Sequence, residues 1–178
     1  MQLSTFVQSG IEPNTVCSIA FAATCPLAVF THDTDKPVAV TECASAHAVH
    51  NVILWMDRRA DIESGFINEK GHRLLKHLGG AMSVLMELPK VLWLKTNTPG
   101  EIFDRCVFYD LTDALAHLAT GNTRTLCTTA CEHEALPIGV DGTIKGWDKE
   151  FLADIRLEDL ARNHFKRIGG VCKVSHYL

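Results

Sequence analysis

The chain has 178 residues, of which 47% are hydrophobic and 21% are charged, and its formal net charge is −4 with histidine neutral. These values fit one globular domain, and the absence of a Lys/Arg-rich arm argues against a nucleic-acid partner. The N-terminus lacks a signal-peptide pattern, and the apolar stretch at residues 16–30 is too interrupted to span a bilayer. Seven irregularly spaced cysteines do not suggest a disulfide framework, so we expect a reduced, cytoplasmic protein without membrane contact.

The first third of the chain reads as β structure. Val16–Phe21 and Leu27–Thr31 are apolar runs that predict two buried strands. A polar turn ends at Pro37, and Val38–Thr41 is expected to return as a hairpin partner. Asn51–Met56 is a further β-branched run, typical of a buried strand.

From Arg59 the apolar residues recur at helical spacing, with an interruption at Gly71 and a stop at Gly79. Pro89 stands where the first residue of a helix is expected, and Leu136–Gly146 reads as a Gly-rich loop. The remaining elements, in chain order, are predicted to be a helical turn at Pro99–Arg105, a strand at Val107–Tyr109, and helices at Thr112–Thr120, Asp148–Ile155 and Leu157–Arg167. Strands come first and helices then alternate with them, so the expected class is α/β.

Two groups of cysteine and histidine residues have partial metal-ligand character. They are Cys127, Cys131 and His133, and Cys43, His47 and His50. Neither contains the paired C-x-x-C spacing of a strong zinc signal, so ordinary cysteines and surface histidines are favoured and no metal site is expected. The chain also lacks both GxxxxGK[ST] and GxGxxG, the glycine-rich loops that bind phosphates.

Three aspartates stand near the ends of predicted elements. Asp110 and Asp113 lie at a helix start, where a carboxylate caps free N–H groups and complements the helix dipole. Asp57 follows a predicted strand, a place where α/β proteins bind ligands. The alternative for Asp57 is a salt bridge with Arg58 or Arg59, and both interpretations stay open.

Five segments resemble the FGGY carbohydrate kinases, in particular their D-ribulose kinase-like branch. They are Ile19–Leu27 (IAFAATCPL), Asn51–Ala60 (NVILWMDRRA), Leu78–Lys95 (containing GGAMSVLMELPKVLWLK), Phe108–Gly121 (FYDLTDALAHLATG) and Arg124–Cys131 (RTLCTTAC). Shorter matches follow in PIGVDG, GWDKEFL and the LEDL run, all in the family's order. The resemblance covers roughly residues 16–170, and the WMDxRA and GGxMSxxMExPKxxWLK patterns are the most specific.

The resemblance implies a ribonuclease-H-like, actin-type ATPase fold with two domains. Such kinases transfer the γ-phosphoryl group of ATP to a sugar hydroxyl with the help of Mg²⁺. Residues 1–170 would be part of the N-terminal, sugar-binding domain, and residues 171–178 have no counterpart. The family's first phosphate loop, adenosine site and catalytic aspartate are expected to lie outside this chain. No catalytic residue is therefore assigned within it, and ATP and Mg²⁺ are not expected to bind this part alone.

The resemblance also assigns a sugar pocket, residue by residue. The matching positions are Ala23, Thr24, Cys25, Trp55, Met56, Asp57 and Asp113, with Glu132 where the family has a lysine. The Thr24 hydroxyl and the Asp113 carboxylate are suited to hydrogen bonds with sugar hydroxyls. The chain departs from the family pattern at Ala22, which replaces an aspartate, and at Thr112, which replaces a proline. At Glu132 the charge is reversed, and an acidic residue there would repel an anionic nucleotide.

These observations predict part of an ATP-dependent pentulose kinase that is inactive as this isolated chain. The alternative is a non-catalytic module that binds a sugar or a protein partner. Loss of the family's first hairpin would expose a sheet edge, so self-association is also expected. A pentulose sugar is the expected small-molecule partner.

Overall fold

The computed structural model describes residues 10–41, 49–121 and 147–169. Within these ranges the sheet has three strands, β1 (Leu27–Thr31), β2 (Val52–Ile53) and β3 (Cys106–Asp110). β1 lies in the middle and runs antiparallel to both neighbours. The first residue of β1 is therefore opposite the last residues of β2 and β3, which matters for the site below.

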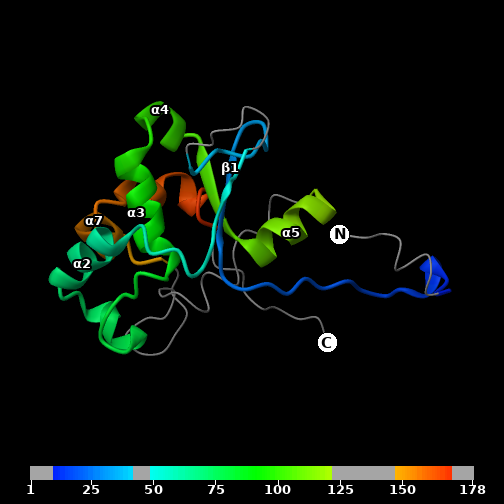
Figure 1. The fold of residues 1–178 in the computed structure, drawn as a ribbon, viewed down its shortest axis with the longest axis horizontal. Helices are drawn as coiled ribbons and strands as arrows, with labels where there is room; N and C mark the ends of the chain where they lie inside the picture. The colour runs from blue at the N-terminus through cyan, green and yellow to red at the C-terminus, as the bar shows by residue number, and fades with distance from the viewer. Residues whose placement is uncertain (1–9, 42–48, 122–146, 170–178) are drawn as a thin grey trace.

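Helices cover both faces of the sheet (Figure 1). In chain order, the helical segments of the described residues are η1 (Pro13–Thr15), α2 (Asp61–Glu69), η2 (Arg73–Leu78), α3 (Glu87–Asn97), α4 (Gly100–Phe103), α5 (Leu111–Thr120), α7 (Lys149–Asp154) and η3 (Glu158–Phe165), the η segments being 3₁₀ helices. In Figure 1, α2, α3, α4 and α7 gather on one side of β1, and α5 lies on the other.

Side chains of β1 and β3 alternate between these two layers. Leu27, Val29 and Phe108 join the larger apolar cluster, which includes residues of α2, α3 and α7. Phe30 and Tyr109 point to the opposite face, in the cluster that includes a residue of α5, with their rings edge to face and centroids 5.8 Å apart. Burial on both faces explains why these strands are almost wholly apolar, since residues alternate from one face of a sheet to the other.

Several helix boundaries follow from capping residues that can be recognised in the sequence. The Asp110 carboxylate accepts a hydrogen bond of 2.8 Å from the amide of Thr112 and so caps α5. Gly121 ends α5 in the left-handed conformation, with φ of 63°, which glycine adopts without steric cost. Gly79 ends η2 in the same way, with φ of 78°. The predicted ends of these two segments, and the capping role of Asp110, are confirmed.

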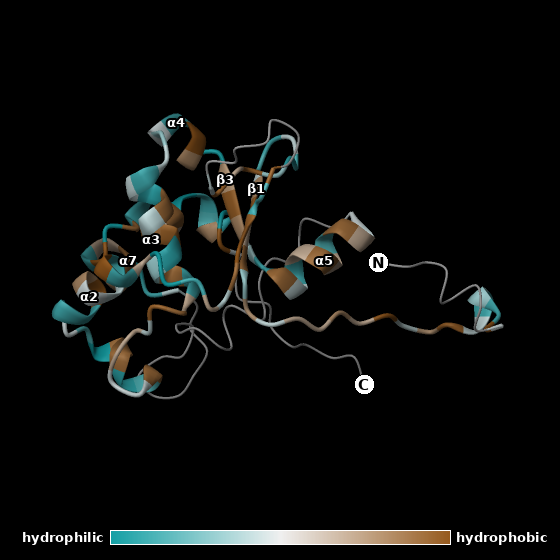
Figure 2. Ribbon diagram, viewed as in Figure 1, coloured by the Kyte–Doolittle hydropathy of each residue, from teal (hydrophilic) through white to brown (hydrophobic). Residues whose placement is uncertain are grey.

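The predicted strand at Val16–Phe21 is wrong. In the structure this segment forms no strand and its first five residues are exposed; Ile19 is 76% exposed. Figure 2 shows the chain before β1 as a largely apolar extension that leads away from the sheet to η1. An apolar run becomes a strand only where another strand offers hydrogen-bond partners, and within the described chain none lies alongside it.

Two other β predictions are corrected in extent. Only Val52–Ile53 of the predicted strand Asn51–Met56 pairs with β1, because the chain turns after Ile53, where the amide of Asp57 donates to the carbonyl of Leu54 at 3.1 Å. The predicted hairpin partner after Pro37 is reduced to a bridge between Phe30 and Pro37, with the Val38 amide bonded to the carbonyl of Val29.

The predicted helix at Leu157–Arg167 is broken. Its 3₁₀ turns are interrupted at Arg162, and both Asn163 and His164 have positive φ. Such residues cannot continue a right-handed helix, because the left-handed region reverses the turn. Pro89 is the third residue of α3 rather than its first. It is tolerated there because the first four N–H groups of a helix have no intrahelical acceptor.

The structure therefore combines helices and strands, as expected, with a small antiparallel sheet between helical layers. None of the helices among residues 10–41, 49–121 and 147–169 is long and apolar enough to cross a membrane.

Candidate functional site

Three segments that the resemblance assigns to a sugar pocket meet at one end of the sheet. Leu27 opens β1 and pairs with Ile53, the last residue of β2, and with Asp110, the last residue of β3. Residues 23–25 lead into this end, and residues 54–57 and 111–113 lead out of it (Figure 1). The carbonyl of Pro26 also accepts a hydrogen bond of 3.0 Å from the amide of Leu111. Backbone pairing thus brings together positions 83 and 85 residues apart in the sequence.

Asp57 is held by Arg59. The guanidinium donates from Nε to Oδ1 at 3.1 Å and from one terminal nitrogen to Oδ2 at 2.7 Å, and the Arg59 amide donates to Oδ1 at 2.9 Å. These hydrogen bonds, with the positive charges of Arg59 and Lys90, hold the pKa of the Asp57 carboxyl below its usual range against the opposing effect of burial. Of the two interpretations of Asp57, the salt bridge with Arg59 is confirmed.

Arg59 itself has a fixed environment. Its other terminal nitrogen donates to the carbonyl of Val40 at 2.7 Å, and its guanidinium lies 4.9 Å from the centre of the Trp93 ring. A planar cation over an indole face, with donors on both edges, is strongly oriented. The Asp57 carboxylate therefore has a defined position, with 26% of its side-chain surface exposed.

The turn before Asp57 presents large apolar side chains to solvent. Leu54, Trp55 and Met56 are 57%, 41% and 60% exposed. An exposed aromatic ring can pack against the C–H groups of a polyol, and a carboxylate can accept hydrogen bonds from its hydroxyls.

Lys90 donates hydrogen bonds to the backbone of this turn. The side chain is fully buried, and its Nζ donates to the carbonyls of Leu54 at 3.0 Å, Trp55 at 2.9 Å and Leu85 at 2.8 Å. Sequence reasoning did not single out this residue as functional. Two signals were present, namely its place as the lysine of the MExPKxxWLK pattern and its position in the apolar run of α3, between Leu88 and Val91.

The other predicted pocket residues differ in burial. Ala23 and Thr24 are exposed and Cys25 is partly buried in the extended chain before β1. Asp113 is 8% exposed in the first turn of α5. The structure therefore brings the three segments to one end of the sheet, with Thr24 open to solvent and Asp113 largely enclosed.

Some sequence predictions fall outside the described residues. They are the charge reversal at Glu132, the segment Arg124–Cys131, the loop Leu136–Gly146, and all but His50 of the two cysteine–histidine groups. These stay as predictions from the sequence.

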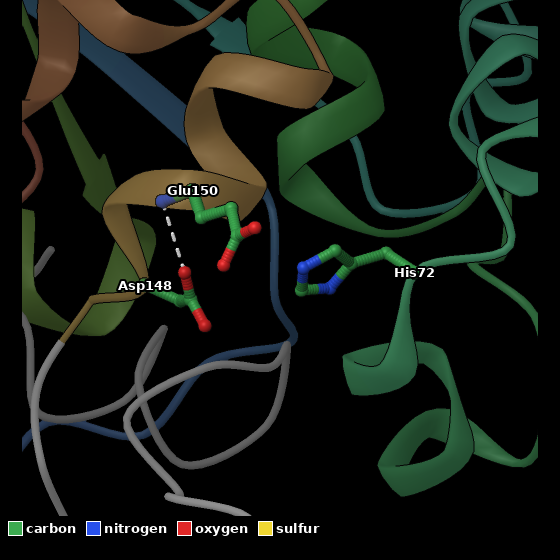
Figure 3. Close-up of side chains that lie close together, drawn as sticks. All are labelled: His72, Asp148 and Glu150. Atoms are coloured by element: carbon green, nitrogen blue, oxygen red, sulfur yellow. Dashed lines mark hydrogen bonds between the residues drawn. The ribbon is translucent and has the colours of Figure 1, made fainter.

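A second polar group lies away from the sheet end, where η2 meets α7. His72, Asp148 and Glu150 converge there (Figure 3), and their ligand-type atoms lie within 4.8 Å of one another. Asp148 caps α7 through the amides of Glu150 and Phe151, at 3.0 and 3.1 Å, and it pairs with Arg73 at 3.2 Å.

The contacts of this group join the beginning of η2 to the beginning of α7. Burial raises the pKa of Asp148, but the amide of Phe151 and the side chain of Arg73 outweigh this and lower it overall. Nδ1 of His72 accepts a hydrogen bond of 3.3 Å from the amide of Leu74 and so caps η2. Nδ1 of His72 and both oxygens of Asp148 therefore have hydrogen-bond partners within the protein. We assign no metal site to the group.

Known proteins match this chain over most of its length. A D-ribulokinase of Saccharomyces cerevisiae is 44% identical over 164 residues, which cover 92% of this chain. FGGY carbohydrate kinase domain-containing proteins of Homo sapiens and Xenopus laevis are 39% and 38% identical over 168 and 161 residues, covering 92% and 89% of the chain. No family model matches the sequence.

The chain spans only part of these relatives. It corresponds to 23% of the length of the yeast protein and 28% of the human and Xenopus proteins.

Proposed function

Over most of its length this chain belongs to the FGGY carbohydrate kinases, and from that premise we propose that it forms part of the sugar-binding region of a pentulose kinase of the D-ribulose type. The yeast relative is named a D-ribulokinase, which supports a pentulose as the ligand. ATP-dependent transfer of a phosphoryl group to that sugar is proposed for the whole kinase.

The observation that carries this proposal is the register of the sheet. Because Leu27 is opposite both Ile53 and Asp110, the segments around Thr24, Trp55–Asp57 and Asp113 share one end of the sheet. They supply a hydroxyl, an exposed indole and two carboxylates. Groups of these kinds suit a small polyhydroxy ligand, whose hydroxyls need several directed partners and whose carbon chain needs an apolar face.

Arg59 and Lys90, two cations beside this turn, are directed to groups of the protein rather than to a triphosphate. The N–H donors of Arg59 are directed to Asp57 and Val40, and Nζ of Lys90 is directed to backbone carbonyls. We therefore derive no phosphoryl-transfer step from these residues and assign them to binding and orienting the sugar.

The alternative function is a module that binds a sugar or a protein without catalysing transfer. The exposed apolar turn at Leu54–Met56 favours this possibility, because apolar side chains that are exposed together often mark an interaction surface. Turnover of the sugar would indicate a kinase, and binding without turnover would indicate a sugar-binding module. Neither turnover nor binding would indicate a module that binds a protein.

A calorimetric titration of the 178-residue chain with D-ribulose tests the proposal. We expect saturable binding, weakened about tenfold or more by Asp113→Asn, since a tenfold loss corresponds to ~1.4 kcal/mol, the size of one hydrogen bond to a charged group. The matched control is Asp154→Asn, an exposed aspartate at the end of α7. Absence of binding, or equal loss in both variants, would remove the sugar-binding proposal.

Catalysis is tested separately. An assay coupled to ADP release, with the chain, Mg²⁺-ATP and D-ribulose, should give no turnover above background. Turnover by the 178-residue chain would overturn the assignment of these residues to binding alone.

A further inference from the structure

Lys90 occupies an unusual place for a lysine. Its side chain has no solvent exposure, and it is one of the largest fully buried side chains among the described residues. It is the fourth residue of α3, where the positive end of the helix dipole disfavours a cation. A methionine or leucine of similar volume would satisfy the packing of this helix, so packing does not require a charged residue here.

The hydrogen bonds of Nζ establish its charge state. The three carbonyls of Leu54, Trp55 and Leu85 are acceptors only, so each requires an N–H donor from Lys90. A neutral amine has two N–H groups and an ammonium has three. The geometry therefore requires a protonated, buried lysine, whose charge these oriented carbonyl dipoles stabilise.

Two of the three acceptors belong to the turn that carries the candidate site. The carbonyls of Leu54 and Trp55 lie directly after β2, and the third, that of Leu85, lies just before α3. One ammonium thus joins the end of β2 to the start of α3. Since the carbonyl of Leu54 also accepts from the amide of Asp57, Lys90 and Asp57 fix the same peptide group.

The turn is then held from both sides. Arg59 fixes the Asp57 carboxylate through two side-chain hydrogen bonds and one from its amide, and Lys90 fixes the backbone that precedes it. The positive charge of Lys90 also contributes to lowering the pKa of Asp57. Trp55 lies between these two anchors, with its ring partly exposed.

From this geometry we infer that Lys90 is a positioning residue for sugar recognition. Its ammonium sets the backbone of Leu54 and Trp55, and thereby the direction in which Trp55 and Asp57 face the end of the sheet. The role in sugar recognition rests on the proposed function above, whereas the role in ordering the turn does not.

The test compares Lys90→Met with Lys90→Arg and with Lys95→Met. Methionine keeps most of the volume and removes the charge, and arginine keeps a charge and N–H donors. Lys95 is the matched control, because it lies on the same helix and donates to the carbonyl of Arg156, away from the turn.

Amide hydrogen exchange reads the order of the turn without any ligand. In Lys90→Met the amides of Asp57 and Arg59 should exchange about tenfold faster or more, whereas those of Val29 and Phe108 in the sheet should change less than twofold. Lys95→Met should leave the turn unchanged, and Lys90→Arg should protect it better than Lys90→Met. Exchange that rises equally in the turn and the sheet, or in neither, would contradict a positioning role.

A measurement on the unmodified chain covers the case in which Lys90→Met does not fold. Nitrogen-detected NMR should show Lys90 Nζ as an ammonium whose protons exchange slowly at neutral pH. A neutral amine, or ammonium protons that exchange as rapidly as those of exposed lysines, would overturn the inference.

Sugar affinity completes the test. The dissociation constant for D-ribulose should rise about tenfold or more in Lys90→Met, rise less in Lys90→Arg and stay unchanged in Lys95→Met. If the unmodified chain binds no sugar, the proposed function fails, and hydrogen exchange alone then decides whether Lys90 orders the turn. Unchanged affinity in Lys90→Met, with binding by the unmodified chain intact, would refute the role in recognition.

Discussion

Among individual residues, Asp57 shows how local charge fixes the candidate site. The pKa of its carboxyl group is lowered because the side chain and the backbone amide of Arg59 both donate hydrogen bonds to it. A carboxyl group with a depressed folded-state pKa stabilises the protein above its unfolded pKa, near 3.8, and loses that contribution as pH falls through the folded value.

Asp57→Asn should therefore destabilise the chain at pH 7 by about 1 kcal/mol, a size typical of a partly exposed, hydrogen-bonded ion pair. The difference between the variant and the parent should shrink as the pH falls below about 4. Urea unfolding at pH 7, 5 and 3 measures it. A difference that grows on acidification would contradict the ion pair.

Asp110 stabilises α5 by capping its N-terminus. Replacing it with alanine removes the acceptor for the Thr112 amide and should cost about 1 kcal/mol, whereas asparagine retains an acceptor and should cost less. Thermal unfolding of Asp110→Ala, Asp110→Asn and the exposed control Asp154→Ala checks this. Equal stability of all three variants would show that the cap contributes little.

Among the helices and strands, α2 offers a test of which helix face packs against the core. Ile67 is fully buried, whereas Ile62 on the same helix is 84% exposed. Ile67→Ala should lower the free energy of unfolding by about 3 kcal/mol through lost burial and a cavity, and Ile62→Ala should change it by less than ~0.5 kcal/mol. The same chemical change on both faces makes this a matched pair, and similar losses in both would contradict the orientation of α2.

Local chemistry made α5 predictable from the sequence. Its beginning at Asp110 and its end at Gly121 follow from capping preferences that act within a few residues. The same reasoning failed for Val16–Phe21, because an apolar run becomes a strand only if a distant segment pairs with it. Local pattern also could not foresee the breaks at Asn163 and His164.

The candidate site was predictable only in part, for a related reason. Family resemblance pointed to Thr24, Trp55–Asp57 and Asp113, and register then placed their segments at one end of the sheet. The role of Lys90 depends on carbonyl groups 35 and 36 residues away along the chain. No spacing in the sequence indicates such contacts.

For the whole molecule, the extended segment before β1 bears on association between copies of the chain. Residues 16–20 are exposed, uncharged and without proline, a composition that favours pairing between chains. We propose that two copies associate through this segment.

Sedimentation velocity over a range of concentrations tests this association. The unmodified chain should show a mean sedimentation coefficient that rises with concentration, and Ile19→Lys should reduce that rise because a charge disfavours pairing at this position. Ile102→Lys, on α4 and 43% exposed, is the control and should behave like the unmodified chain. A chain that is monomeric throughout, or equal effects of both variants, would contradict the proposal.

The central claim is that one end of the sheet binds a sugar, and NMR mapping of that ligand tests it most directly. On titration with D-ribulose, the amides of residues 23–25, 54–57 and 111–113 should shift together with a single saturation curve, and those of α4 and α7 should stay in place. Shifts confined to other elements, or no saturable shift at millimolar D-ribulose, would contradict the claim.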